Sequence, residues 1–356
     1  MQTFVKGFKT WAKLGDVQTE NVVFKIHCKI TVLMLILFSV LLSSKQYFGD
    51  PIDCDVAQRK EIVNLYCWTT GTFIIDKKVE GSSDLQGLGN LASAGSKETF
   101  TLLYYQWVWF LFLLQALCFY APKHVWRLWE RRQLAQIIQD LCGPLVTEKW
   151  TLEYKEKIVS YLLHARNLDI YSFRFAVCEF LTLVNLIFQI LLMNWYLKGE
   201  YLSYGVNVAT GAWPESMNRV FPKRAKCNYT RYGASGSVES RDALCVLPLN
   251  TLNEKFFLIL WYYFAVLMIL TIGALTFRFL FLYSGKVREH LLKMRVAGHG
   301  IGNKKIKTIV EHLSHGQFFA LHHMSKNLNP IIFDELLVEL LGRVVRHRRD
   351  NSISVP

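Results

Sequence analysis

Four long stretches of the chain contain no Asp, Glu, Lys or Arg and are almost wholly apolar. They cover residues 30–44, 99–122, 180–197 and 256–277, and are 15, 24, 18 and 22 residues long. An α-helix rises about 1.5 Å per residue and a bilayer core is about 30 Å thick, so about 20 residues span it. The first stretch is short, but Lys29 and Lys45 at its ends can reach the headgroups. The pattern predicts four transmembrane helices.

The spans divide the chain into nine expected segments, with both termini on one side of the membrane. These are an N-terminal helix at 1–20, a first span at 21–48, a loop at 49–98, a second span at 99–122, a helical loop at 123–174, a third span at 175–197, a loop at 198–255, a fourth span at 256–285 and a helical tail at 286–356. In the two helical segments, apolar residues recur at spacings of three and four.

Composition and charge agree with a membrane protein and orient it. Hydrophobic residues make up 52% of the chain and charged ones only 19%, below the roughly 25% usual for soluble domains, which argues against a soluble enzyme. Of the 41 Lys and Arg, 27 lie in residues 1–29, 123–179 and 278–356, the parts between the apolar runs on the side of the termini. Because positive residues stay on the inner side, both termini are expected in the cytosol. The net charge of +13 is then explained by the positive residues on the cytosolic side, and no nucleic-acid partner is expected.

Four of the eight cysteines fall in the two loops that would lie outside. Cys54 and Cys67 are in the first loop, and Cys227 and Cys245 in the second. An even number of thiols in an oxidising compartment predicts two disulfides, with three possible pairings. Zinc is disfavoured, because the spacings of 13 and 18 residues do not match structural zinc motifs.

The start of the second span carries an aromatic pentapeptide, Tyr104-Tyr105-Gln106-Trp107-Val108. Physically it is expected to form an aromatic belt at the outer membrane surface, and Pro122 to break or kink the inner end of the span. The pentapeptide resembles the signature of the innexins, the invertebrate gap-junction proteins. Residues 49–54, 232–237 and 247–255 also resemble that family, and the likeness extends to about residue 340.

The resemblance implies a plasma-membrane channel at cell junctions, with eight subunits per membrane and with docking to the hemichannel of a neighbouring cell. It implies an all-α membrane protein with four transmembrane helices, an N-terminal pore helix, disulfide-linked extracellular loops with some β structure and a helical cytosolic domain. It also favours the pairs Cys54–Cys245 and Cys67–Cys227. The partners would be the same or other innexin-like subunits and membrane lipid.

The N-terminal segment is patterned as a short basic amphipathic helix. Phe4, Phe8 and Trp11 lie on one side, and Lys6, Lys9 and Lys13 on the other. Such a helix can lie on the inner leaflet. The resemblance instead places it in the pore mouth, so the predicted pore residues are Met1, Gln2, Thr3, Phe4, Lys6, Lys9 and Lys13. A ring of these lysines is expected to favour anions or slow cations.

The third span carries a polar stripe, Glu179, Thr182, Asn185 and Gln189. We expect it to form hydrogen bonds with neighbouring helices, the alternative being that it lines the conduit. The C-terminal histidines His312, His315, His322 and His323 lack a ligand pattern for metal and are interpreted as a solvated helix face.

The only glycosylation sequon begins at Asn228, directly after Cys227. A glycan there would stand near the docking surface and would favour a channel of a single membrane, as in the related pannexins. A further alternative is a four-span adhesion or scaffold protein that conducts nothing. No catalytic motif or cofactor motif is found, so neither an enzyme nor a cofactor is expected.

Overall fold

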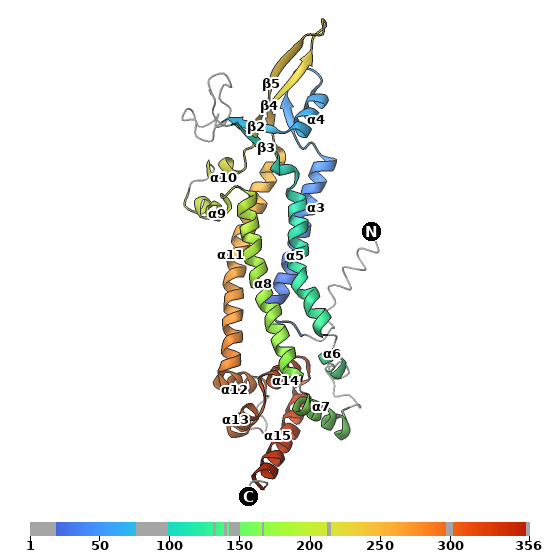
Figure 1. Cartoon of the computed structure of the whole chain (residues 1–356), viewed down its shortest axis with the longest axis vertical. Coiled ribbons are helices and arrows are strands. Elements are labelled where there is room, and N and C mark those ends of the chain that lie inside the picture. The colour runs from blue at the N-terminus through green and yellow to red at the C-terminus, as the bar shows by residue number, and fades with distance from the viewer. Residues whose placement is uncertain are drawn as a thin grey trace. The chain divides into compact units, whose positions relative to one another are not determined.

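The structure is a computed structural model that describes residues 19–75, 99–130, 133–138, 141, 150–165, 167–211, 215–296 and 302–353. Four helices in these ranges are long and apolar enough to cross a membrane, at Val22–Phe48, Val108–Glu130, Leu168–Tyr196 and Pro248–Tyr283. The last three are α5, α8 and α11, and the first consists of α2 (Val22–Lys25), a π-helical stretch (Ile26–Thr31) and α3 (Val32–Phe48). The predicted fold class, helical with four long apolar helices and a small disulfide-linked sheet, is confirmed (Figure 1).

The second long helix differs from the sequence-based expectation at both ends. It begins at Val108, because Thr99–Leu102 form a strand and Tyr104–Gln106 a short 3-10 helix. Pro122 does not break the helix, which continues to Glu130. A proline removes a single N–H donor, and the apolar turns on either side are long enough for the helix to extend past it.

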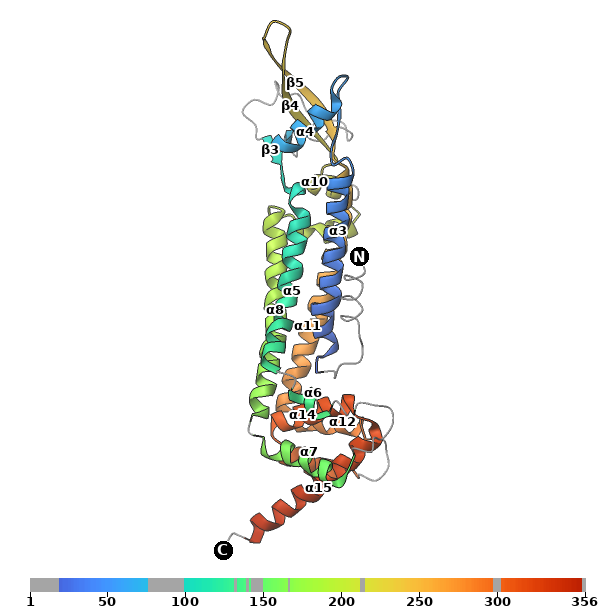
Figure 2. The same ribbon diagram turned by 90° about the vertical axis from the view of Figure 1, so that its right-hand side faces the viewer.

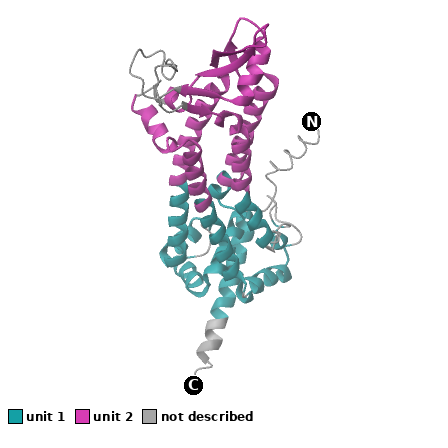
Figure 3. Cartoon of the chain, turned by 45° about the horizontal axis from the view of Figure 1, so that its top comes forward, with its two compact units in different colours: residues 1–26, 121–183, 270–356 teal, residues 27–120, 184–269 magenta. Residues whose placement is uncertain are grey.

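The chain divides into two compact units, which are coloured separately in Figure 3. Unit 1 contains residues 1–26, 121–183 and 270–356, and unit 2 contains residues 27–120 and 184–269. The division falls within each of the four long helices.

Unit 2 carries a five-stranded antiparallel sheet in the order β1-β5-β4-β2-β3. The strands are β1 (Asp53–Asp55), β2 (Thr72–Ile75), β3 (Thr99–Leu102), β4 (Arg224–Tyr232) and β5 (Val238–Val246), and Figure 1 shows the long β4–β5 hairpin near α4 (Lys60–Thr70). Both predicted outer loops thus contribute strands to one sheet. Two short helices, α9 (Tyr201–Ala209) and α10 (Glu215–Val220), precede β4.

Unit 1 is helical. Besides parts of the long helices it contains α6 (Gln133–Ile138), α7 (Leu152–His164), α12 (Gly285–Lys293), α13 (Asn303–His312), α14 (His315–Asn327) and α15 (Pro330–Ile353) (Figure 2; α13 is labelled in Figure 1). Helix α14 is buried along most of its length. Its Phe319 contacts Tyr171 and Phe175 of α8, with ring centroids 5.8 Å and 5.5 Å apart, and Trp126 packs on the same two rings. This buried aromatic cluster joins α5, α8 and α14 within unit 1.

Candidate functional site

The two disulfides of unit 2 join the two predicted outer loops. Cys54 in β1 lies directly opposite Cys245 in β5, and the two are bonded. Cys67 in α4 is bonded to Cys227 in β4. This is the pairing that the family resemblance implies.

Both cystines are fully buried and form the middle of a shared core. The core takes residues from both loops, including Ile52, Val63 and Ile74 from the first and Ala225 and Leu247 from the second. Linking distant positions removes freedom from the unfolded chain, and the two bonds span 191 and 160 residues. The sulfurs of Cys54, Cys67 and Cys245 lie within 4.8 Å of one another, but sulfur held in a disulfide has no thiolate to offer a metal.

The aromatic signature connects this core to the second span. Tyr105 is 2% exposed, and its ring packs on Trp68 of α4 at 5.2 Å. The side-chain amide of Gln106 donates to the backbone carbonyl of Trp68. Tyr104 donates from its hydroxyl to the carbonyl of Val220, 3.3 Å away, just before the second loop enters the sheet. The signature therefore holds both loops at the start of α5.

Only part of the signature forms the expected aromatic belt. Trp107 is 61% exposed on the surface of the helix, whereas Tyr105 is buried and Tyr104 is half-buried. Burial raises the pKa of both tyrosine hydroxyls, so both stay protonated, and Tyr104 acts as a donor. The sequence pattern showed aromatic residues at a membrane surface but not which of them turn inward.

Asn228 of the sequon lies in β4 with an exposed side chain. Its amide oxygen accepts a hydrogen bond from the hydroxyl of Ser240 in β5, 2.8 Å away. The side chain is accessible to a glycan, because successive residues of a strand face opposite sides and Cys227, the preceding residue, faces the buried core.

The polar stripe of α8 is largely turned into the protein. Glu179, Thr182 and Gln189 are at most 5% exposed. Thr182 donates to the backbone carbonyl of Glu179, and Gln189 donates to the side chain of Asn185 one turn away. Within the described ranges, Glu179 is the one member of the stripe with hydrogen bonds to other helices.

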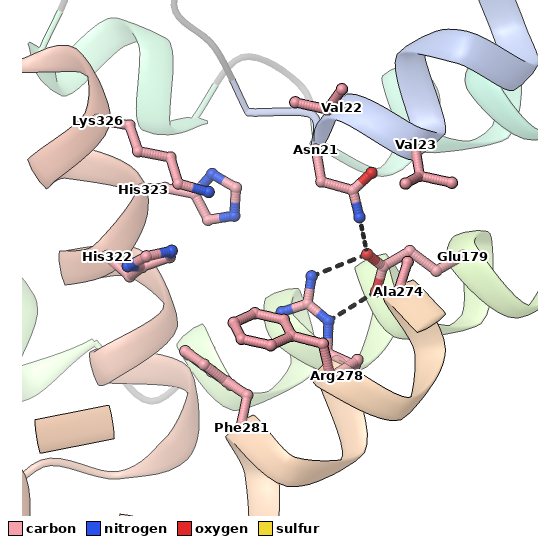
Figure 4. A pocket seen from close by; sticks show the side chains of 11 residues that line it. Asn21, Val22, Val23, Glu179, Ala274, Arg278, Phe281, His322, His323 and Lys326 are labelled. Atoms are coloured by element: carbon pink, nitrogen blue, oxygen red, sulfur yellow. Dashed lines mark hydrogen bonds and ion pairs between the residues drawn. The ribbon is translucent and has the colours of Figure 1, made fainter. Parts of the chain in front are cut away.

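Glu179 is the centre of a buried ion-pair cluster in unit 1, drawn in Figure 4. Arg278 of α11 donates to both carboxylate oxygens, at 2.6 Å and 3.0 Å. Asn21 donates to the same carboxylate, while its side-chain oxygen accepts from the backbone N–H of Phe24 and so caps α2. The guanidinium also lies 4.9 Å and 5.1 Å from the rings of Phe319 and Phe175.

Sequence reasoning missed Arg278 as the partner of Glu179. A signal was present, because one carboxylate and one arginine border the cytosolic ends of two neighbouring apolar runs. A charge at such a position is usually paired.

The histidines of the C-terminal region were only partly predicted. His312 and His315 are exposed, as expected of a solvated face. His323 is 2% exposed and packs edge-on against Phe319, with ring centroids 4.4 Å apart, so the interpretation is wrong there. His322 is half-buried against Phe281. Both lie on the side of α14 that packs into unit 1.

The predicted pore residues Met1, Gln2, Thr3, Phe4, Lys6, Lys9 and Lys13 lie outside the described residues.

Comparison with known proteins agrees with these features. The family model described as Innexin matches residues 20–344. Innexin inx2 of Schistocerca americana is 39% identical over 93% of this chain and 95% of its own length, and innexin inx2 of Drosophila melanogaster is 36% identical over 92% of each chain. Innexin shaking-B of Drosophila melanogaster is 33% identical over 97% of this chain and 95% of its own length. The chain belongs to the innexin family and is a multi-pass membrane subunit of oligomeric gap-junction channels.

Proposed function

We propose that eight copies of the chain form a hemichannel that docks with a hemichannel of the adjacent cell and passes ions and small metabolites between the two cytoplasms. The observation that carries this proposal is the disulfide-linked sheet, in which both loops share one core and present one hairpin. Docking requires a surface that is rigid before contact, since ordering flexible loops on binding would cost free energy.

The hairpin has the chemistry needed for docking to a copy of itself. Its turn and the strand ends around it are exposed, including Tyr232 and Val238. Arg231 and Arg241 lie on the same hairpin as Glu239 and Asp242, all with exposed side chains. Two identical surfaces can dock only if they are complementary to themselves. A hairpin that carries both positive and negative side chains meets this condition, because each charge can face an opposite one on the other copy.

The proposed orientation places the disulfide-linked loops, 49–98 and 198–255, outside the cell, and the termini and segments 123–174 and 286–356 in the cytosol. Disulfides persist in oxidising compartments, and the excess of Lys and Arg is on the opposite side, so redox chemistry and charge favour the same orientation.

The N-terminal helix at 1–20 is proposed as the pore funnel, with Lys6, Lys9 and Lys13 facing the conduit. A rotational axis repeats each lysine around the pore, which should favour anions. Reversal potentials under a salt gradient are expected to shift towards cation permeation in the triple variant Lys6→Gln, Lys9→Gln, Lys13→Gln. Equal reversal potentials in wild type and variant would contradict the placement.

The docking proposal is tested in paired cells that each express the chain. Junctional conductance and dye transfer between the cells are expected, with dye uptake from the medium as the readout of undocked hemichannels. Adhesion of the cells without either conductance or dye transfer would favour the scaffold alternative.

A channel confined to one membrane is the second candidate, and the exposed Asn228 favours it. If Asn228 is glycosylated, glycosidase treatment shifts the mobility of the chain, and Asn228→Gln abolishes the shift. Junctional conductance that appears only in Asn228→Gln would assign the wild-type chain to the single-membrane class.

A further inference from the structure

Unit 1 contains a pocket of about 210 Å³ next to the Glu179–Arg278 pair. Figure 4 shows His322, His323 and Lys326 of α14 on one side of it, and Asn21, Glu179 and Arg278 on the other. Pockets that hold drug-sized ligands usually measure about 300–1,000 Å³. The pocket therefore suits a small chemical group or one part of a larger molecule.

The polar part of the pocket carries more positive than negative charge. Arg278 and Lys326 line it, and Glu179 is its only lining acid among the described residues. Glu179 already accepts hydrogen bonds from Arg278 and Asn21. Within the ranges that the structure describes, Lys326 forms no ion pair, so its charge is left for another anion.

The electrostatics of Lys326 agree with an excess of positive charge. Lys326 is an exposed residue, but partial desolvation of its amine lowers the pKa, and Arg295 and Arg278 lower it further, while Glu179 opposes the shift. An anion bound between Lys326 and Arg278 would relieve this repulsion.

The remaining walls are apolar and come from the ends of two long helices. Val22 and Val23 belong to α2, and Ala274, Phe277 and Phe281 to α11. Val22 and Phe277 are well exposed, so the pocket has an apolar flank beside its basic end. Basic pockets beside the ends of transmembrane helices are suited to phospholipid headgroups.

We propose that this pocket binds a phosphate group, held by Lys326 and Arg278 and flanked by His322. The phosphate can come from an anionic phospholipid or from a free phosphate, and the apolar flank favours the lipid. The proposal does not depend on docking or on the number of subunits.

The test is titration of the purified full-length channel, in a neutral detergent, with dioctanoyl phosphatidylserine, followed by native mass spectrometry. Dioctanoylglycerol has the same chains without the phosphate and is the ligand control. We expect phosphatidylserine to bind, dioctanoylglycerol to bind much more weakly, and Lys326→Gln to weaken phosphatidylserine binding at least tenfold, since one charge-assisted hydrogen bond is lost.

Lys304→Gln is the matched control, because Lys304 is an exposed lysine of α13 that does not line the pocket. It should bind phosphatidylserine as the wild type does. His322→Gln is a second variant in the pocket and is expected to weaken binding less than Lys326→Gln, because a neutral donor is replaced by another. Competition by millimolar inorganic phosphate would support a site for free phosphate, and its absence a site for the lipid headgroup. Equal binding by wild type, Lys326→Gln and Lys304→Gln, or equal binding of the two lipids, would overturn the proposal.

Discussion

Glu179 shows at the scale of a single residue how a charge is kept inside unit 1. Its carboxylate is 5% exposed and is matched by a bidentate arginine and an amide. Two charges removed from water are tolerated only when their geometry and hydrogen bonds are good, and removing one partner leaves the other buried alone.

Glu179→Gln is expected to destabilise the protein by about 3–5 kcal/mol, because Arg278 would keep an uncompensated charge. The double variant Glu179→Gln, Arg278→Gln should recover part of the loss, since neither charge remains. Thermal unfolding of the purified channel measures both. Glu153→Gln, which breaks an exposed pair with Lys157, is the control and should leave the melting temperature unchanged. A double variant less stable than the single variant would contradict the explanation.

His322 predicts a pH dependence of stability. Burial, Lys326, Arg295 and Arg278 lower its pKa to about 3 in the folded protein, whereas an ordinary histidine in the unfolded chain has a pKa of about 6.5. Between these values the unfolded state binds the proton first, so stability falls as the pH falls from about 6.5 towards 3.

We expect His322→Gln to lose less stability than wild type between pH 7 and pH 5, by roughly 1–2 kcal/mol. Chemical unfolding at the two pH values measures the difference. His312→Gln, at an exposed position of α13, should keep the wild-type dependence. Identical pH dependence in wild type and His322→Gln would show that the pKa of His322 is the same in the folded and the unfolded protein, and would contradict the prediction.

At the scale of the elements, the contact between α14 and α8 depends on Gly316. A Cβ atom at this position would overlap backbone atoms of Leu168 and Asp169. The N–H of Gly316 donates to the Asp169 carboxylate at 2.7 Å, and Ser314 and Gln317 form a capping box at the start of α14. Gln317 also accepts from the backbone N–H of Ser314, so this glutamine has a structural role at the start of α14.

Gly316→Ala is expected to destabilise the protein by about 1–3 kcal/mol or more, because backbone atoms cannot move aside as a flexible side chain would. Gly285→Ala is the matched control, since a Cβ at that helix start meets nothing within 4 Å. The melting temperatures of the two purified variants measure the difference, and Gly316→Ala is expected to melt lower than Gly285→Ala. Equal melting temperatures would contradict the packing argument.

In the aromatic signature at the start of α5, Tyr105 packs into the protein core, whereas Trp107 is exposed. Tyr105→Ala should cost about 3–5 kcal/mol, as expected when a large buried ring is removed, and Trp107→Ala should cost much less in detergent because Trp107 is exposed. Equal losses of stability in the two variants would mean that Tyr105 is not part of the core.

At the scale of the whole molecule, the disulfides are the only covalent links between the two outer loops that the described residues contain. Removing a native disulfide from a small domain typically costs about 2–5 kcal/mol. We expect the loss of stability to be confined mainly to the sheet, because its core is small and contains both cystines.

The double variant Cys54→Ser, Cys245→Ser is therefore expected to lose junctional conductance in paired cells. Cys118→Ser changes a cysteine of α5 outside both disulfides and should conduct as the wild type does. Surface biotinylation of the chain separates a failure of docking from a failure to reach the membrane. Wild-type conductance in the double variant would show that docking does not need the linked sheet.

Much of this protein follows from the sequence by itself. The four spans could be predicted because the length of an apolar run is a local property of the sequence. It can be compared directly with the number of helical residues needed to cross the bilayer. The family, and through it the disulfide pairing, followed from short motifs such as residues 104–108. By contrast, spacing alone left three disulfide pairings open.

Only the tertiary structure decided which distant residues meet. The pairing of Glu179 with Arg278, the inward position of Tyr105 beside the exposed Trp107, and the burial of His323 in an aromatic cluster all depend on how helices and loops pack. The start of α5 at Val108 was likewise decided by the sheet, because Thr99–Leu102 pair with β2 instead of extending the helix. Hydrophobic periodicity shows which residues leave water, but their partners are selected by contacts between segments far apart in the chain.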